Sequence, residues 1–137
     1  MNRELFSETL KKHHLSSTKA RRTVFDILDA EHQAMTMKQL VYAAAPSLDR
    51  STVYRIVELF EDIGIVTKVY TGWKYRVELS DTFSSHHHHM TCQICGDIIS
   101  FHESNEIENA LHKVALQHGY ELKSHSLELR GLCRSCR

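Results

Sequence analysis

The chain has 137 residues, 42% hydrophobic and 25% charged, which suffices for one ordinary domain or two small ones. Its 17 Lys and Arg residues balance its 17 Asp and Glu residues, so the overall charge gives no support to nucleic-acid binding. No apolar run is long enough to span a bilayer, and residues 1–5 lead into a charged amphipathic stretch rather than a secretory signal. We therefore expect a cytoplasmic protein that does not contact a membrane.

Four amphipathic segments in the first half of the chain predict helices. A Ser, Thr or Asp before an apolar-periodic run is typical of a helix start, whereas proline and glycine are typical of a stop. The start signals are Thr18 or Ser17, Thr36, and Asp49 or Ser51, and the stop signals are Pro46 and Gly64. We expect helices over residues 4–13, 18–30, 37–45 and 50–63.

The last of these helices is the candidate for reading DNA. Its apolar residues recur with helical spacing, at Val53, Ile56, Val57 and Phe60. Residues 65–79 then read as a β-hairpin with a turn at Thr71-Gly72, and helices followed by a hairpin are the order of a winged helix. In that arrangement the start of the last helix enters the major groove, so the candidate readers are Arg50, Ser51, Thr52, Tyr54 and Arg55. An ordinary solvated helix face is the alternative.

A polar stretch over residues 81–85 predicts a hinge between a winged-helix domain over 1–80 and a second domain over 86–137. In the second domain we expect strands near 90–92 and 97–101, a helix from about Ser104 to His118, and a strand over about 124–132. One helix and three short strands are too few to close a core. The sequence therefore predicts an α+β fold whose C-terminal α/β domain dimerises through a shared sheet.

All four cysteines lie in the second half, as two Cys-x-x-Cys pairs: Cys92 with Cys95, and Cys133 with Cys136. Each pair can chelate one ion, and together they complete a tetrahedron of four sulfurs. Two disulfides are the alternative, but a cytoplasmic chain disfavours them. We predict a structural Zn²⁺.

Four histidines, residues 86–89, run directly into the first cysteine pair. On a strand, successive side chains point to opposite faces, so His86 and His88 share one face and His87 and His89 share the other. The run therefore contributes half of each of two separate sites for a divalent metal ion. A remnant of a purification tag is the alternative, although tags sit at termini.

Three motifs together resemble the ferric uptake regulator (Fur) superfamily: residues 51–55 followed by Gly64, the segment from His86 to Cys95, and the segment from His125 to Cys136. The resemblance covers nearly the whole chain. It implies a dimeric, metal-dependent transcription regulator, a repressor that binds a palindromic operator in double-stranded DNA. It also implies an N-terminal winged helix and a C-terminal dimerisation domain.

The resemblance also implies site residues. It gives structural zinc to the four cysteines, and a regulatory site to Glu78, His87 and His89, with His32 as an offset loop ligand because Ala stands at position 34. It gives an additional site to His86, His88, Glu108 and His125, and it extends the DNA contacts to Thr18, Lys19 and Arg21. A wing-surface role for Glu78 and a helix-capping role for Glu108 are the alternatives.

The predicted regulatory donors are nitrogen and oxygen only, which permits Fe(II), Mn(II), Ni(II) and Zn(II). Zinc-sensing relatives often place a cysteine near this site, so Glu78 favours Fe(II). Zinc-sensing and peroxide-sensing members of the same family are the alternatives, although Ser100 stands where peroxide-sensing members carry an aspartate. From another class, the histidine run suits a metal store or chaperone.

We do not expect an enzyme. A zinc deaminase needs His-x-Glu and a Pro-Cys-x-x-Cys, whereas His102 and Glu103 are adjacent here and neither cysteine pair follows proline. No activated nucleophile stands out either.

Overall fold

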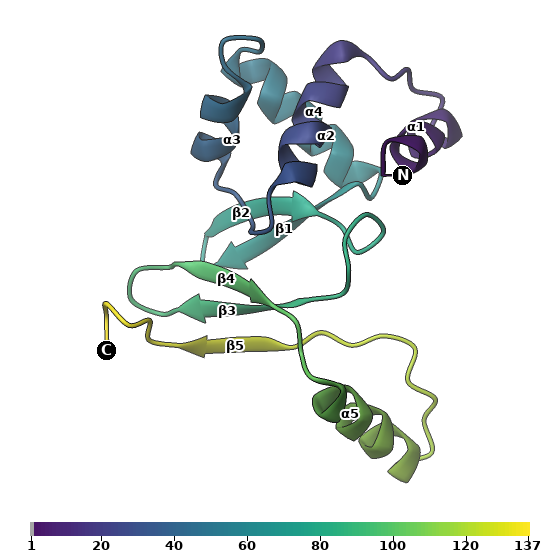
Figure 1. Ribbon diagram of the computed structural model, residues 1–137, viewed down its shortest axis with the longest axis vertical. Coiled ribbons are helices and arrows are strands. Elements are labelled where there is room, and N and C mark those ends of the chain that lie inside the picture. The colour runs from purple at the N-terminus through teal and green to yellow at the C-terminus, as the bar shows by residue number, and fades with distance from the viewer. Residues whose placement is uncertain (1) are drawn as a thin grey trace. The chain divides into compact units, whose positions relative to one another are not determined.

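The computed structural model describes residues 2–137 as two compact units, the first ending at Ser85 and the second running from His86 to Arg137. Figure 1 shows the order of elements along the chain. The first unit contains α1 (Asn2–Lys12), α2 (Lys19–Ala30), α3 (Met37–Ala44), α4 (Arg50–Asp62), β1 (Val66–Thr71) and β2 (Lys74–Leu79). The second contains β3 (His88–Cys92), β4 (Ile98–Phe101), α5 (Asn105–Gln117) and β5 (Glu128–Gly131). Within residues 2–137, every helix falls short of the length and apolarity that a membrane span requires.

The helix starts in the first unit are those that the sequence predicts. The Thr18 hydroxyl accepts the backbone N–H of Arg21, and the Asp49 carboxylate accepts that of Thr52 at 2.8 Å. Thr36 and Gln39 form a reciprocal capping box. These caps satisfy backbone donors that have no partner inside the helix, so they define where α2, α3 and α4 begin.

Three phenylalanines from three different helices make the centre of the first unit. The rings of Phe6 and Phe25 stack with centres 4.3 Å apart, and Phe60 meets Phe6 edge-on at 5.6 Å. The predicted apolar face of α4 is confirmed, because its buried residues are Val53, Ile56, Val57 and Phe60. This burial leaves the opposite face of α4 to solvent, which is the face that carries the candidate readers.

Strands β1 and β2 form an antiparallel hairpin in which Thr71 pairs with Lys74. The two-residue turn is therefore Gly72-Trp73, one residue later than the sequence predicts. Gly72 has a φ of +63°, which favours glycine at the first central position of such a turn. Val77 of β2 also bridges to Met35 before α3, which ties the hairpin to the helices.

The polar stretch over residues 81–85 contains one apolar anchor. Phe83 is buried and meets the ring of Phe25 edge-on at 5.4 Å. Its backbone N–H bonds to the carbonyl of Ser80, which closes a turn. The stretch that the sequence presents as a hinge thus packs on the core of the first unit as far as Phe83.

The second unit is a three-stranded sheet in the order β4-β3-β5, with β3 antiparallel to β4 and parallel to β5. The last strand is shorter than predicted, since only residues 128–131 pair with β3. Figure 1 shows α5 set apart from the strands, and none of its residues is buried. The apolar stripe that the sequence predicts on this helix, including Ile107 and Val114, is largely exposed in the single chain.

Candidate metal centres and nucleic-acid interface

The pairing of β3 with β5 gathers the four cysteines. Cys92 ends β3 and lies beside Gly131, so the two Cys-x-x-Cys turns follow adjacent strand ends. None of the four cysteines forms a disulfide, and their Sγ atoms all lie within 4.8 Å of one another. The Sγ atoms of Cys95 and Cys133 are 3.8 Å apart. Four sulfurs bound at about 2.3 Å to one tetrahedral zinc are separated by roughly this distance, so the cluster fits Zn²⁺.

The protonation of these thiols is uneven. Backbone N–H groups, that of Cys133 first, lower the pKa of the Cys92 thiol to about 6. Hydrogen bonding with Cys133, and then burial, raises the pKa of Cys136 to about 12. Four adjacent sulfurs cannot all ionise unless a cation compensates their charge, and a bound divalent ion supplies that charge.

A second cluster forms at the other end of the same sheet. Extending the β3–β4 register two residues beyond the pair His88–Phe101 places Glu103 across from His86. Extending the β3–β5 register three residues below the pair His89–Glu128 places His125 on the other side of His86. The sheet therefore brings a central histidine between a carboxylate and an imidazole, and His88 shares its face.

Distances within this cluster are those of potential metal ligands. The Nε2 atoms of His86 and His125 lie 3.2 Å apart, and His125 Nε2 lies 3.3 Å from Glu103 Oε1. His88 Nε2 contacts the other oxygen of Glu103. The side chains of His88 and Glu103 are 2% and 6% exposed, yet His88 Nε2 and Glu103 Oε2 have no hydrogen bond of good geometry. Buried polar atoms without such partners fit a site that an ion would complete.

Glu103 is the ligand candidate that the sequence reasoning missed, while the predicted Glu108 lies at the edge of the cluster. Glu108 Oε2 is 3.3 Å from His125 Nε2, and its side chain is 35% exposed. The signal that identifies Glu103 is strand register, because only the pairing of β3 with β4 puts position 103 across from His86. Burial acts to raise the pKa of Glu103, but hydrogen bonding with Glu108 and the charge of His88 outweigh it and lower that pKa.

On the other face of β3, His87 and His89 lie together with ring centres 5.0 Å apart. The alternation predicted for the four histidines is therefore present, since His86 and His88 gather with Glu103 and not with this pair. Glu78, the third predicted regulatory ligand, is half-buried on β2 of the first unit. His32 is exposed in the loop before α3, and it belongs to no cluster of three or more potential ligands among residues 2–137.

The candidate DNA readers lie in the first two turns of α4. Arg50, Ser51 and Arg55 are exposed. The Arg50 guanidinium lies over the Tyr54 ring at 5.1 Å, and Arg55 Nε donates to the carbonyl of Ser51 at 3.4 Å. Thr52 is partly buried beside the Asp49 cap. Two cations and a phenol thus line one exposed helix face, the composition that phosphate and base-edge contacts need.

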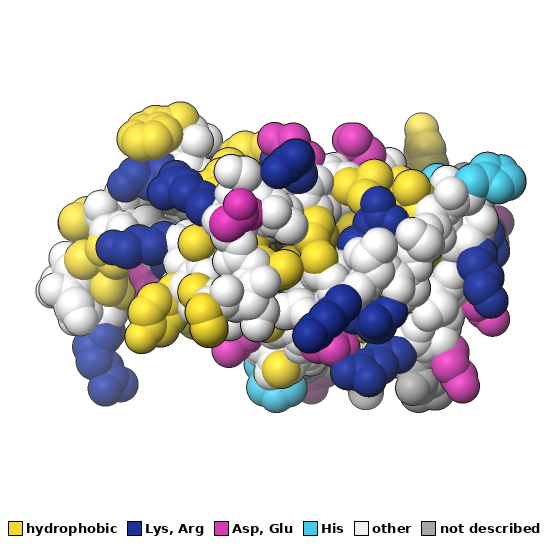
Figure 2. All heavy atoms as spheres, turned by 90° about the horizontal axis from the view of Figure 1, so that it is seen from above, with side chains coloured by type: hydrophobic (Ala, Val, Ile, Leu, Met, Phe, Trp, Pro, Cys, Tyr) yellow, Lys and Arg dark blue, Asp and Glu magenta, His cyan; other side chains and the backbone are white. Residues whose placement is uncertain are grey.

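The start of α2 carries the remaining predicted DNA contacts. Thr18 is the N-cap, Lys19 is exposed, and Arg21 donates to the carbonyl of Ser16 at 2.6 Å. Figure 2 shows one face of the molecule, on which Lys and Arg side chains lie among Asp and Glu rather than in a single basic patch. The cations on this face are dispersed, so the candidate DNA contacts are local groups such as those on α4.

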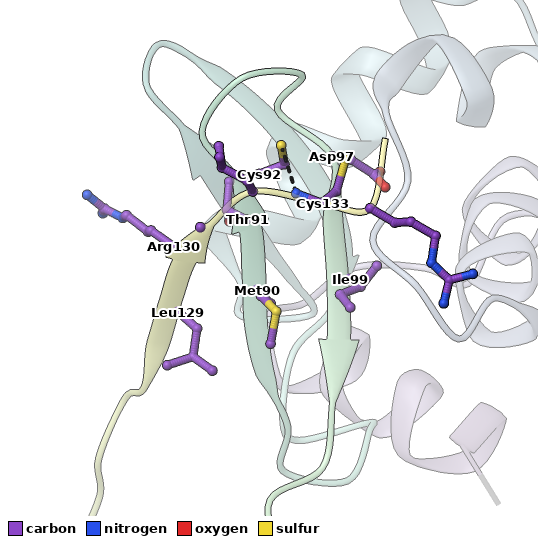
Figure 3. Close-up of a pocket in the computed structure, with 11 residues that line it drawn as sticks. Met90, Thr91, Cys92, Asp97, Ile99, Leu129, Arg130 and Cys133 are labelled. Carbon is purple, nitrogen blue, oxygen red and sulfur yellow. Dashed lines mark hydrogen bonds between the residues drawn. The ribbon is translucent and has the colours of Figure 1, made fainter. Parts of the chain in front are cut away.

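A hollow of about 440 Å³ opens on the sheet of the second unit beside the cysteines (Figure 3). Met90, Ile99 and Leu129 line it as a cross-strand row, because Met90 pairs with each of the other two. These three side chains are 39–48% exposed. An apolar row of this kind on a sheet face is typical of a surface that another element covers.

A winged helix with cations on its reading helix, together with a unit that gathers cysteine and histidine clusters, defines a metal-responsive transcription regulator. The sequence profile described as the Ferric uptake regulator family matches residues 12–130, and the chain belongs to this family. The chain is 36% identical over 135 residues to the ferric uptake regulation protein of Yersinia pestis, covering 94% of this chain and 88% of that protein. It is 35% identical over 129 residues to the Escherichia coli K12 protein of the same name, covering 90% and 85%.

Solved structures show the same fold. The ferric uptake regulator of Helicobacter pylori, described as having three functional metal binding sites, superposes with a TM-score of 0.82 at 26% identity. That match covers 98% of this chain and 91% of the other. The Pseudomonas aeruginosa regulator with manganese matches with a TM-score of 0.74 at 29% identity, covering 93% and 97%. Proteins of this family regulate transcription and are not enzymes, which agrees with the sequence-based expectation.

Proposed function

We propose that this chain is a cytoplasmic, dimeric repressor that binds a palindromic operator when a divalent ion, Fe(II) first, fills its regulatory site. The observation that carries the proposal is the division of four consecutive histidines between two faces of β3. His86 and His88 join Glu103 and His125, while His87 and His89 form a separate pair. Neither set shares a residue with the cysteine cluster, so a structural ion and sensed ions have separate donors.

Zn²⁺ is the ion that the four cysteines would hold, and there it supplies folding free energy rather than sensing. The regulatory ion would be held by His87 and His89 from the second unit and Glu78 from the first, with His32 as a further ligand from the loop before α3. His86, His88, Glu103 and His125 would hold the additional ion, and Glu108, the carboxylate that the sequence predicts, would lie at the edge of this site. A regulatory ion with donors from both units would couple metal occupancy to the placement of the winged helices. A coupling free energy of about 1–3 kcal/mol would make binding switchable.

DNA contact is assigned to Arg50, Ser51, Thr52, Tyr54 and Arg55, supported by Thr18, Lys19 and Arg21. In a symmetric dimer the two α4 helices would read half-sites about 34–36 Å apart, one turn of DNA. Two exposed apolar features support the dimer. Helix α5 has no buried residue, and the sheet presents the row of Met90, Ile99 and Leu129. A partner copy would cover both surfaces at once.

The test is a gel-shift titration of a palindromic operator with zinc-loaded protein, with and without Fe(II) under anaerobic conditions. We expect tight binding only with Fe(II), and no response to Fe(II) in His87→Ala. His13→Ala is the matched control, because His13 is exposed in the turn just after α1 in the first unit. Equal operator affinity with and without metal would overturn the proposal.

Zinc sensing is the second candidate, because imidazole and carboxylate donors also suit Zn(II). The same titration with Zn(II), Mn(II) and Ni(II) ranks the metals. The salt dependence of DNA binding distinguishes a metal store from both kinds of regulator. The affinity of a DNA binder falls steeply as the salt concentration rises, whereas a metal store has no DNA affinity to lose.

A further inference from the structure

His102 is a histidine of the second unit that the sites above leave unused, and strand register places it beside the regulatory pair. Extending the β3–β4 ladder one residue beyond the pair His88–Phe101 puts His102 across from His87. The same ladder pairs His89 with Ser100. Residues directly opposite each other on antiparallel strands point to the same face. His87, His89 and His102 therefore share one face of the sheet.

Ring positions agree with this register. The ring centres of His87 and His102 lie 6.3 Å apart, and those of His87 and His89 lie 5.0 Å apart. Two imidazoles that bind one ion through nitrogen bonds of about 2.0–2.1 Å have ring centres roughly 5–6.4 Å apart, depending on the angle between them. The His87–His89 separation is close to that of two ligands at a tetrahedral angle, whereas the His87–His102 separation is near the upper limit. The His102 ring would therefore have to turn toward the pair to bind the same ion.

One ring nitrogen of His102 is hydrogen-bonded to the backbone, as in many histidines that bind a metal through the other nitrogen. Its Nδ1 lies 3.0 Å from the backbone carbonyl oxygen of His86. A carbonyl only accepts, so in the neutral imidazole Nδ1 carries the proton and Nε2 keeps its lone pair. Histidines that bind metals almost always donate their second ring N–H to such an acceptor, which fixes the tautomer and the orientation of the ring.

We propose that His102 is a further ligand of the ion held by His87 and His89, and that it helps to select this ion. The inference rests on the proposed regulatory site. Ser100, across from His89, offers a hydroxyl on this face, which is a weaker donor than an imidazole. A third imidazole would favour binding of Fe(II), Ni(II) and Zn(II) over Mn(II), because imidazole ligands suit the first three ions better.

Cobalt(II) is the probe for this proposal, because its visible spectrum reports the number and kind of ligands. The zinc-loaded protein is titrated in a His125→Ala background, which removes a donor from the other histidine cluster. We expect His102→Ala to weaken Co(II) binding by about tenfold or more and to lower and shift the visible bands. His13→Ala is the control and leaves both unchanged. A His102→Ala protein with the affinity and spectrum of its parent would overturn the proposal.

Two further measurements keep the outcomes distinct. If His87→Ala also leaves Co(II) binding unchanged, the regulatory site itself is absent, and the proposed function fails with it. If only His102→Ala is without effect, the site stands and the added ligand is wrong. Should the His125→Ala background fail to fold, the Co(II)-loaded full chain is examined by NMR. His102→Ala should lose one hyperfine-shifted imidazole N–H resonance relative to His13→Ala, and an unchanged count would contradict the assignment.

Discussion

Glu103 Oε1 lies 3.3 Å from the Nε2 atom of His125, and this contact joins a residue that follows β4 to one that precedes β5. Its two partners approach from opposite edges of β3, so only the assembled sheet brings them together. The carboxylate is buried at the centre of the histidine cluster, where a divalent ion would neutralise it.

Glu103→Gln is therefore expected to weaken divalent metal binding at this cluster by roughly 10- to 100-fold, because it removes a negative charge from beside three imidazoles. Isothermal titration with Zn(II) or Mn(II), on protein already zinc-loaded at the cysteines, measures the effect. Glu106→Gln is the matched control, since Glu106 is exposed in the first turn of α5. Identical titrations for the two variants would show that Glu103 has no part in binding.

Strand register explains which parts of this site are predictable from sequence. The alternation of four histidines between two faces follows from strand geometry alone. The pairing of two Cys-x-x-Cys motifs follows from their spacing and from the four thiolates that a zinc ion takes. Glu103 could not be found in this way, because its neighbourhood depends on which residue of β4 stands across from each residue of β3. Without that register, Glu108 on the following helix looks equally suitable.

Local sequence signals explain why the helix starts of the first unit are predicted correctly. Thr18, Thr36 and Asp49 are caps whose chemistry acts within a few residues, so they mark helix starts in any fold. Phe83 shows the limit of such signals: the four polar residues around it in the stretch 81–85 predict a linker, yet its aromatic ring packs in the core. Long-range packing of this kind leaves no periodic pattern in the sequence.

Removal of the structural ion should affect the two units differently. Cys133→Ser, or a strong chelator, is expected to unfold the sheet of the second unit, because zinc in such sites contributes on the order of 10–16 kcal/mol to folding. The first unit should stay folded around Phe6, Phe25 and Phe60. Circular dichroism and amide NMR spectra measure both, and Ser135→Ala is the control between the two cysteines. A Cys133→Ser chain with all its NMR signals intact would contradict a structural role for the ion.

Asp49 should make the stability of α4 depend on pH. Its hydrogen bonds with Thr52 hold its pKa below the ordinary value of 3.8. Because the folded-state pKa is depressed, the contribution is present above the unfolded-state pKa and is lost as pH falls through the folded-state value. We expect the difference in unfolding free energy between the wild type and Asp49→Asn to be constant near neutral pH and to shift against the wild type below about pH 4. Urea unfolding at a series of pH values measures this, and a pH-independent difference would contradict it.

The exposed stripe of α5 gives the last prediction. Val114 is 54% exposed, and it lies on the apolar stripe of a helix that has no buried residue in the single chain. If a partner copy covers this stripe, Val114→Asp buries an unpaired charge in the dimer and should raise its dissociation constant by tenfold or more, since each 1.4 kcal/mol is tenfold. Lys113→Asp is the matched control: it adds the same carboxylate at the neighbouring position, beside the stripe. Sedimentation equilibrium measures both variants. If Val114→Asp dissociates no more readily than Lys113→Asp, the partner contacts a different surface of the second unit, and the sheet row of Met90, Ile99 and Leu129 becomes the next surface to alter.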